Sequence, residues 1–124
     1  MSLKRSTQKS LKKLHAAIKV AAGLDPYMTL TRLDSFLTFA TQNDIRSMED
    51  LRDRLTNENI SNSSVYRNIS YWLEQSWLRP DGSRPDGEKF IRDYLDPEDH
   101  RRKLLTLTPR GTTWCDKLAD PLEK

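Results

Sequence analysis

Residues 99–111 carry the sequence Asp-His-Arg-Arg-Lys-Leu-Leu-Thr-Leu-Thr-Pro-Arg-Gly. The apolar and β-forming residues at 104–108 predict a strand, and Pro109 directly after them is a favoured first residue of a helix. Upstream, residues 90–95 alternate in polarity and are rich in β-forming types, so they predict a second strand. Turn-forming residues connect the two runs. We therefore expect one long β-hairpin over residues 88–108.

The segments on either side of this hairpin also carry clear signals. Residues 79–87 contain the turn signature Arg-Pro-Asp-Gly twice, which predicts an extended loop region before the first strand. After the hairpin, Pro109 is expected to open a short last helix with Trp114 and Leu118 on one face. We expect Pro121 to end that helix, because proline lacks the backbone donor that a helix needs.

Four helices are expected before the hairpin, because apolar residues recur there at helical spacing. Their predicted ranges are 7–22, about 29–41, 47–55 and about 61–76. Gly23 is a natural stop for the first of them, and Ser47 with Asp50 predicts a capping box at the start of the third.

The buried side of the fourth helix has two possible registers. One register buries Val65, Ile69, Trp72 and Leu73, and the other buries Tyr66, Ile69 and Leu73. The sequence leaves both open at this point, although the choice decides which residues face outward.

This order of elements predicts a mainly α fold with a small β-hairpin, in the α+β class. We expect a winged helix-turn-helix with four helices, a long two-stranded wing and a short C-terminal helix. The chain of 124 residues has the length of one domain. The expected parts of this single domain (1–124) are a basic N-terminal helix (1–24), a helical core with the helix-turn-helix (25–78), an extended wing (79–108), and a short C-terminal helix and tail (109–124).

Composition excludes several classes of protein. No stretch approaches the roughly 20 apolar residues that span a bilayer, and residues 1–10 lack the apolar segment of a secretory signal. The single cysteine, Cys115, excludes an internal disulfide. His15 and His100 lie far apart, so no metal-ligand cluster is expected. We expect a cytoplasmic protein without membrane association, metal or cofactor.

The net charge of +3 is unevenly distributed. Residues 1–22 contain six basic residues and no acid, whereas residues 41–76 contain four basic and six acidic residues. Residues 76–110 contain eight basic and seven acidic residues. Because neutralisation of phosphates supplies much of the affinity for DNA, tight binding would need the N-terminal segment, a second subunit, or acids that lie away from the contact face.

The segment 99–111 resembles the wing of MarR-type winged-helix regulators. The residues at the family's spacing are Asp99, Arg101, Leu105, Leu107, Thr108 and Gly111. Residues 60–67 resemble the start of that family's recognition helix, and residues 73–78 resemble its end. The resemblance covers about residues 25–118, and its wing motif is more specific than its helix motifs.

The resemblance implies a homodimer on pseudo-palindromic double-stranded DNA, with the recognition helix in the major groove. It also implies that Arg101 reaches the minor groove or a phosphate. Asp99 would hold that guanidinium or the hairpin through a charge-assisted contact. Thr108 would cap the last helix, and Gly111 belongs to the same wing-structuring motif.

The sequence departs from the family pattern in four respects. The stretch between Leu78 and Asp99 is longer than usual, and Trp77 stands where the family usually has glycine. The recognition helix carries one extra residue. The chain after Gly111 is too short for the family's long C-terminal dimerisation helices. We therefore expect dimerisation through residues 7–22 and 111–119, or by another geometry.

The candidate DNA-binding residues are polar or basic, which suits hydrogen bonding to bases and phosphates. They are Ser61, Asn62, Ser63, Ser64, Arg67, Asn68 and Tyr71 on the outward or leading side of the fourth helix, and Arg101, Arg102 and Lys103 on the wing. The alternative is that these residues only cap the helix and form a solvated surface.

These features predict a sequence-specific DNA-binding transcriptional regulator that represses by occupying its operator. The sequence shows no nucleophile–base constellation and no glycine-rich phosphate loop, so we expect no enzymatic activity. The large aromatic residues are expected in the core or an interface rather than stacked on bases, namely Trp72, Trp77, Trp114, Phe36 and Phe39. One alternative is a winged-helix protein-interaction module that binds a host polymerase or replication factor. Another is a replication or partition factor that binds DNA without regulating a promoter.

Overall fold

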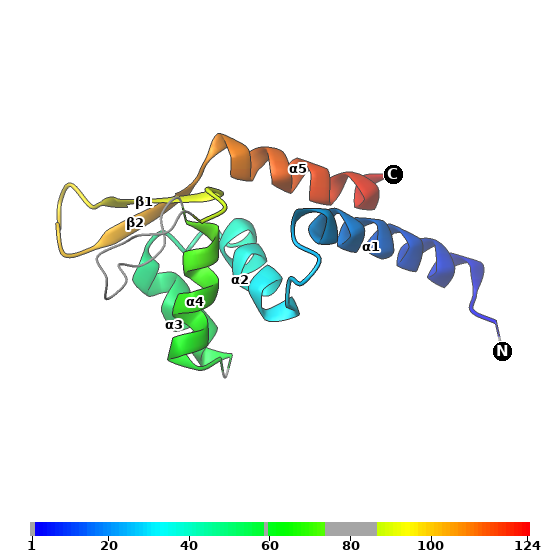
Figure 1. The fold of residues 1–124 in the computed structure, drawn as a ribbon, viewed down its shortest axis with the longest axis horizontal. Helices are drawn as coiled ribbons and strands as arrows, with labels where there is room; N and C mark the ends of the chain where they lie inside the picture. The colour runs from blue at the N-terminus through cyan, green and yellow to red at the C-terminus, as the bar shows by residue number, and fades with distance from the viewer. Residues whose placement is uncertain (1, 59, 74–86) are drawn as a thin grey trace.

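A computed structural model describes residues 2–58, 60–73 and 87–124. The described chain is mainly helical, with a two-stranded antiparallel hairpin, which confirms the predicted α+β class. In chain order, its elements are α1 (Arg5–Leu24), α2 (Leu30–Thr41), α3 (Met48–Asn57), α4 (Asn62–Trp72), β1 (Ile91–Leu95), β2 (Lys103–Leu107) and α5 (Pro109–Glu123). Figure 1 shows α2, α3 and α4 grouped together, the hairpin projecting from one end, and α1 projecting from the other. None of the described helices has the length and apolarity that a bilayer crossing requires.

Side-chain caps explain where the helices begin. Thr29, Ser47, Ser61 and Thr108 each precede a helix and accept a hydrogen bond from the backbone N–H three residues later. At α3 the predicted capping box is confirmed, because the Asp50 carboxylate in turn accepts from the backbone N–H of Ser47. Each such cap satisfies a donor that the helix itself leaves free, and its loss typically costs about 1 kcal/mol.

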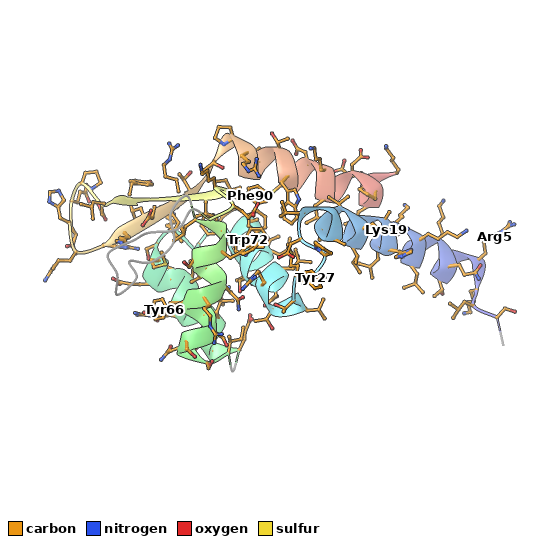
Figure 2. All side chains as sticks on the ribbon, viewed as in Figure 1. Arg5, Lys19, Tyr27, Tyr66, Trp72 and Phe90 are labelled. Atoms are coloured by element: carbon orange, nitrogen blue, oxygen red, sulfur yellow. The ribbon has the colours of Figure 1, made fainter. Side chains whose placement is uncertain are left out.

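Helix α4 adopts the first of the two registers. Val65, Ile69 and Trp72 are buried, whereas Tyr66 lies on the outer side of the helix (Figure 2). The predicted end at residue 76 is wrong, because Leu73 already has an extended backbone and forms a parallel bridge with Ile91. The helix ends there because the backbone of its last turn pairs with the segment that leads into β1. The doubled turns at 79–87 lie almost wholly outside the described residues, as do Trp77 and residues 74–76.

The hairpin forms where the sequence predicts it. Its register pairs Ile91 with Leu107 and Leu95 with Lys103. A third segment joins its edge, because Ser47 forms an antiparallel bridge with Leu104 and the N–H of Leu105 donates to the carbonyl of Arg46 at 2.9 Å. The hairpin is therefore tied to the start of α3.

Aromatic side chains form the centre of the core. Phe36, Trp72, Phe90 and Trp114 lie in mutual contact, with ring centroids 4.8 Å apart for Phe36–Trp72 and 5.2 Å apart for Phe90–Trp114. Trp72 and Phe90 lie between α4, the hairpin and α5 (Figure 2). The indole N–H of Trp72 donates to the carbonyl of Arg32 at 3.0 Å. Burial of these rings, together with Phe39, confirms that the described aromatic residues of this set are core residues.

Helix α5 is longer than predicted and contains Pro121 inside its last turn. The expected stop at Pro121 is therefore wrong. A proline this close to a helix end removes only one hydrogen bond, so the helix continues to Glu123. Helix α5 packs lengthwise against α1, where Ala17 and Ala21 are buried, while the N-terminal part of α1 extends beyond α5 (Figure 1).

Gly111 allows the close approach of α5 to the hairpin. A Cβ at this position would lie 2.2 Å from the carbonyl oxygen of Phe90. We expect Gly111→Ala to lower the free energy of unfolding by about 1–3 kcal/mol, because backbone would have to move in a packed core. Chemical denaturation measures this difference. Gly23→Ala is the matched control, since nothing lies within 4 Å of its added Cβ. Equal stability of Gly111→Ala and the unsubstituted protein would contradict the close approach.

Candidate nucleic-acid interface

The outward side of α4 carries most of the predicted DNA-contacting residues. Ser61, Asn62, Ser63 and Arg67 are exposed, and Ser64 is half-buried. They occupy this side because Val65, Ile69 and Trp72 take the opposite face into the core. Within the part of the chain that the structure describes, the Arg67 guanidinium has no hydrogen bond or ion pair. It is also the only charged residue of α4.

Two residues predicted on this outward side lie elsewhere. Asn68 is 7% exposed, and its Oδ1 accepts a hydrogen bond from Nε of Arg32 at 3.2 Å. Tyr71 is half-buried, and its hydroxyl donates to Asp25 at 3.1 Å. Both face α2, which packs along this flank of α4. Their predicted outward position is therefore wrong, because the sequence of α4 alone does not show where α2 lies.

The environment of Tyr71 keeps its phenol protonated. Burial, the negative charge of Glu88 and the hydrogen bond to Asp25 together raise the pKa of Tyr71 above its ordinary value. The hydroxyl is thus a fixed donor to Asp25. This hydrogen bond links α4 to the segment between α1 and α2.

The tip of the hairpin presents Arg101 to solvent. Its side chain is 93% exposed, and its Nε donates to Oδ1 of Asp99 at 3.2 Å. The backbone N–H of Arg101 donates to the same oxygen at 3.1 Å. The predicted Asp99–Arg101 contact is confirmed. The predicted cap is confirmed as well, since Thr108 Oγ1 accepts from the N–H of Gly111 at 3.0 Å.

The next two basic residues of the hairpin point back to the protein. Arg102 lies 3.4 Å from Oδ2 of Asp50 on α3, and Lys103 Nζ lies 3.6 Å from Oδ2 of Asp93 on β1. Both side chains are partly exposed but already have carboxylate partners. Of the three basic wing residues, Arg101 is therefore the one that is directed away from the body of the protein.

Asp50 links the start of α3 to the hairpin. Burial alone would raise its pKa, but hydrogen bonds from Arg46 and Ser47 and the charge of Arg102 outweigh it, so the pKa of Asp50 lies below its usual value. The ionised carboxylate thus caps α3 and contacts the hairpin through Arg102.

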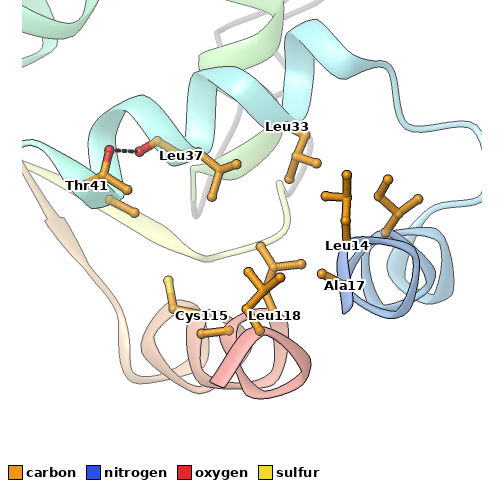
Figure 3. A pocket seen from close by; sticks show the side chains of 11 residues that line it. Leu14, Ala17, Leu33, Leu37, Thr41, Cys115 and Leu118 are labelled. Atoms are coloured by element: carbon orange, nitrogen blue, oxygen red, sulfur yellow. Dashed lines mark hydrogen bonds between the residues drawn. The ribbon is translucent and has the colours of Figure 1, made fainter. Parts of the chain in front are cut away.

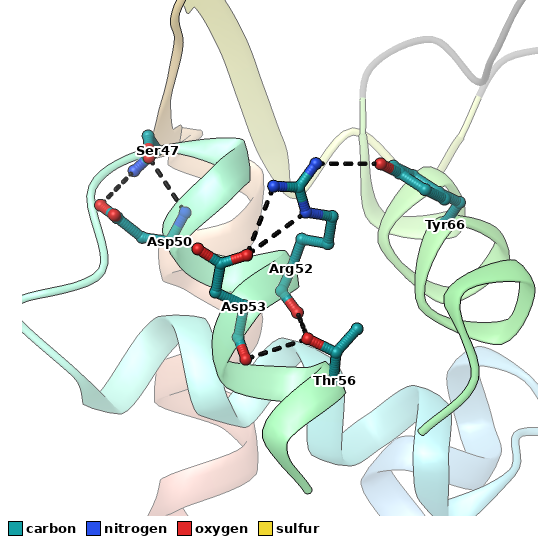
Figure 4. A network of polar contacts seen from close by, with 6 residues as sticks. All are labelled: Ser47, Asp50, Arg52, Asp53, Thr56 and Tyr66. Atoms are coloured by element: carbon teal, nitrogen blue, oxygen red, sulfur yellow. Dashed lines mark hydrogen bonds and ion pairs between the residues drawn. The ribbon is translucent and has the colours of Figure 1, made fainter. Parts of the chain in front are cut away.

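Three of the five acidic residues described in 41–73, namely Asp44, Asp50 and Asp53, form ion pairs with arginines. Asp53 pairs with Arg52 at 3.3 Å, and Asp44 pairs with Arg54 at 2.8 Å. Arg52 also donates to the hydroxyl of Tyr66 at 3.3 Å, which links α3 to α4 (Figure 4). The described acidic residues of this region lie on α3, in the loop before it and, for Glu58, directly after it, and none lies on α4.

One basic residue near α4 is not among the residues predicted from the sequence to contact DNA. Arg32, in the first turn of α2, lines a cleft of about 280 Å³ together with Thr29, Thr31, Ser64, Arg67 and Asn68. A basic residue three positions after a threonine cap was the available signal, but the sequence does not show that the start of α2 lies beside α4.

A second cavity is apolar and lies between α1, α2 and α5. It has a volume of about 320 Å³ and is lined by residues that include Leu14, Ile18, Leu37, Cys115 and Leu118 (Figure 3). Burial and the neighbouring Asp116 raise the pKa of the Cys115 thiol, which favours its protonated form. We refer to this cavity as the apolar groove.

Residues 2–58, 60–73 and 87–124 contain no group of three or more side chains placed to hold a metal ion. In comparisons with family models, curated proteins and solved structures, nothing matches this chain.

Proposed function

We propose that this protein is a cytoplasmic winged helix-turn-helix regulator that binds double-stranded DNA sequence-specifically and represses by occupying its operator. The observation that carries this proposal is the presentation of two arginines. Arg67 stands on the outward side of α4 without a partner among the described residues, and Arg101 stands on the exposed tip of the hairpin.

The arrangement of elements supports the winged-helix part of the proposal. Two short helices, α3 and α4, are followed by a hairpin whose edge is joined by the segment before α3. Helix α4 has 11 residues and is therefore about 16 Å long. A rod of this size fits a major groove about 12 Å wide, while a projecting hairpin reaches the phosphates or the neighbouring minor groove.

The charge distribution favours DNA contact by α4 rather than by α3. Asp44, Asp50 and Asp53 are paired with arginines, whereas Glu49 on α3 and Glu58 at its end have no such pair among the described residues. Helix α4 itself carries only the positive charge of Arg67. Serine and asparagine at the start of α4 add neutral donors and acceptors that hydrogen-bond to bases without electrostatic repulsion.

A homodimer is part of the proposal, and the exposed surface supports it. Leu11, Leu14 and Ile18 on α1 and Leu122 on α5 are about half exposed at or beside the apolar groove, so this is the expected interface.

Dimerisation also bears on the charge of the DNA-binding surface. Arg5 and Lys19 mark the basic helix α1, which projects from the side opposite the hairpin (Figure 2). In one chain this basic segment is remote from Arg101. A second subunit therefore has to supply the additional positive potential that tight binding needs.

A salt series on duplex DNA of random sequence tests the proposal. Fluorescence anisotropy of a labelled duplex is expected to show binding at low salt and a steep linear fall of log affinity with log salt concentration. Absence of binding at low salt by correctly folded protein would refute it.

A protein-interaction module is the second candidate, and the hairpin favours it. Tyr94 and Leu95 on β1 are 46% and 55% exposed, and such side chains suit a protein partner. A polymerase or replication factor would then contact the hairpin. Folded protein that fails to bind duplex DNA, and loses partner binding after Tyr94→Ser, is the result expected from this candidate.

A further inference from the structure

The cleft beside α4 has the composition of an anion site. The first turn of α2 and the N-terminal half of α4 form its walls, and their N-terminal ends lie on the same side of the molecule (Figure 1). Its lining consists of Thr29, Thr31, Arg32, Ser64, Arg67 and Asn68. The lining thus has two guanidinium groups and no carboxylate. We call this site the phosphate cleft for the reasons that follow.

Arg32 is held in place without being neutralised. Its Nε donates to Oδ1 of Asn68 at 3.2 Å, and its guanidinium carbon lies 4.4 Å from the centre of the Tyr71 ring. Both contacts orient the guanidinium plane, but neither supplies a negative charge. Within the described residues, Arg32 has no ion pair. A preorganised guanidinium loses little side-chain entropy when it binds an anion.

Asn68 adds an oriented donor to the cleft. The side chain is more than nine-tenths buried, and its Oδ1 is used by Arg32. Because Oδ1 must be the acceptor, the amide Nδ2 is the atom left to donate. Nδ2 has no acceptor in the part of the chain that the structure describes, and Asn68 lines the cleft. No fully buried side-chain nitrogen or oxygen of the described residues lacks a hydrogen-bond partner, so this Nδ2 is reached by solvent and is available to donate to a group in the cleft.

Arg67 completes the donor set from the other wall. It is exposed and lacks a partner among the described residues, and Thr31 and Ser64 add hydroxyl groups. The cleft also lies at the first turn of α2, which contains no acidic residue. The positive end of that helix dipole therefore adds to the two arginine charges.

We propose that the phosphate cleft binds one phosphate group. The planar guanidinium group of arginine donates two parallel hydrogen bonds that match two oxygens of a phosphate. Asn68 Nδ2 and the hydroxyls of Thr31 and Ser64 can donate to its remaining oxygens. The source that the position favours is a backbone phosphate of duplex DNA, and this source rests on the proposed function. A phosphate held there would set the angle at which α4 enters the groove, since phosphate contacts position a protein on DNA. Free phosphate is the other source of the same chemistry.

The first arm of the test uses the full chain with a labelled duplex of random sequence over a range of salt concentrations. Arg32→Gln removes the charge but keeps an amide donor near Asn68, so the fold is retained. We expect about tenfold weaker binding and a salt slope that is smaller by about 0.9, the value for one phosphate. Arg32→Lys is expected to restore the slope.

Arg110→Ala is the matched control for this arm. Arg110 also stacks on an aromatic ring, with its guanidinium carbon 5.4 Å from the centre of Phe90, and also donates to a neighbour. It belongs to α5, on the side of the molecule away from the N-terminal ends of α2 and α4 (Figure 1). Its replacement is expected to leave the salt slope unchanged. An equal loss of slope in both variants would overturn the assignment to the phosphate cleft.

The second arm separates the two sources of phosphate. Inorganic phosphate is added to the unsubstituted protein at constant ionic strength, and the NMR signals of Arg32 Nε–H and Asn68 Nδ2–H₂ are followed. Saturable shifts together with the Arg32→Gln effect on DNA support the DNA source. Saturable shifts without any duplex binding keep the cleft as a free-phosphate site but refute the proposed function.

The proposal fails on two results. If the protein binds duplex DNA with the same slope after Arg32→Gln and neither signal shifts, DNA binding stands and the phosphate cleft is wrong. If there is no duplex binding and no shift, both proposals are wrong. Because the second arm uses unsubstituted protein, it decides the matter even where a variant does not fold.

Discussion

Replacing Arg67 by alanine is expected to weaken binding of duplex DNA about tenfold or more, and replacing Arg101 is expected to have an effect of similar size. A well-placed arginine contact to a base is worth about 1–3 kcal/mol, and a phosphate contact contributes through counterion release. Neither change is expected to alter stability, because both side chains are exposed and the Arg101–Asp99 pair lies at the surface. Fluorescence anisotropy at fixed salt measures the affinity.

Arg54→Ala is the matched control for these two variants. It removes the same charge from the same region, but Arg54 is already paired with Asp44 at 2.8 Å. A small effect of Arg54→Ala beside large effects of Arg67→Ala and Arg101→Ala would identify specific contacts. Equal effects of all three would mean that only net charge matters. Unchanged affinity in both Arg67→Ala and Arg101→Ala would contradict their assignment as DNA-contacting residues.

Ile18→Glu is expected to convert a homodimer into a monomer and to reduce operator affinity at least a hundredfold. Ile18 is 46% exposed on α1 and lines the apolar groove, where a partner chain would cover it. Burial of an unpaired carboxylate in such an interface is costly, and each monomer then engages only one half-site. Light scattering after size-exclusion chromatography gives the mass, and anisotropy gives the affinity.

Ala16→Glu is the control for this substitution. Ala16 lies on the same helix and is exposed, but it does not line the groove, so the same carboxylate remains in solvent. It is expected to leave the mass unchanged. An unsubstituted protein that is monomeric at micromolar concentration would contradict the proposed dimer before any variant is made.

The local elements could be predicted because each depends on residues close together in the chain. The capping box at Ser47 and Asp50 is a contact over three residues, and it forms as predicted. The Asp99–Arg101 contact and the Thr108 cap, which the resemblance to MarR-type wings implied, are similarly local. The alternating residues of the hairpin also place its two strands, since the period of two identifies a strand from sequence alone.

The candidate site was only partly predictable. Exposure of Ser61, Asn62, Ser63 and Arg67 follows from the helical period once the register of α4 is known. The two registers differ by a single residue in their buried side, and packing of Trp72 in the aromatic core selected between them. The sequence of α4 contains no information on that packing.

By itself, the sequence determined the order of the helices, their caps, the hairpin and the exposed arginine at its tip, because these follow from contacts within a few residues. Only the tertiary structure decided that Asn68 and Tyr71 face α2, that α4 ends at Trp72, and that Arg32 lies beside Arg67. These facts depend on residues 16 to 46 positions apart in the chain, whose approach is set by how the apolar faces of α2, α4 and the hairpin pack into one core.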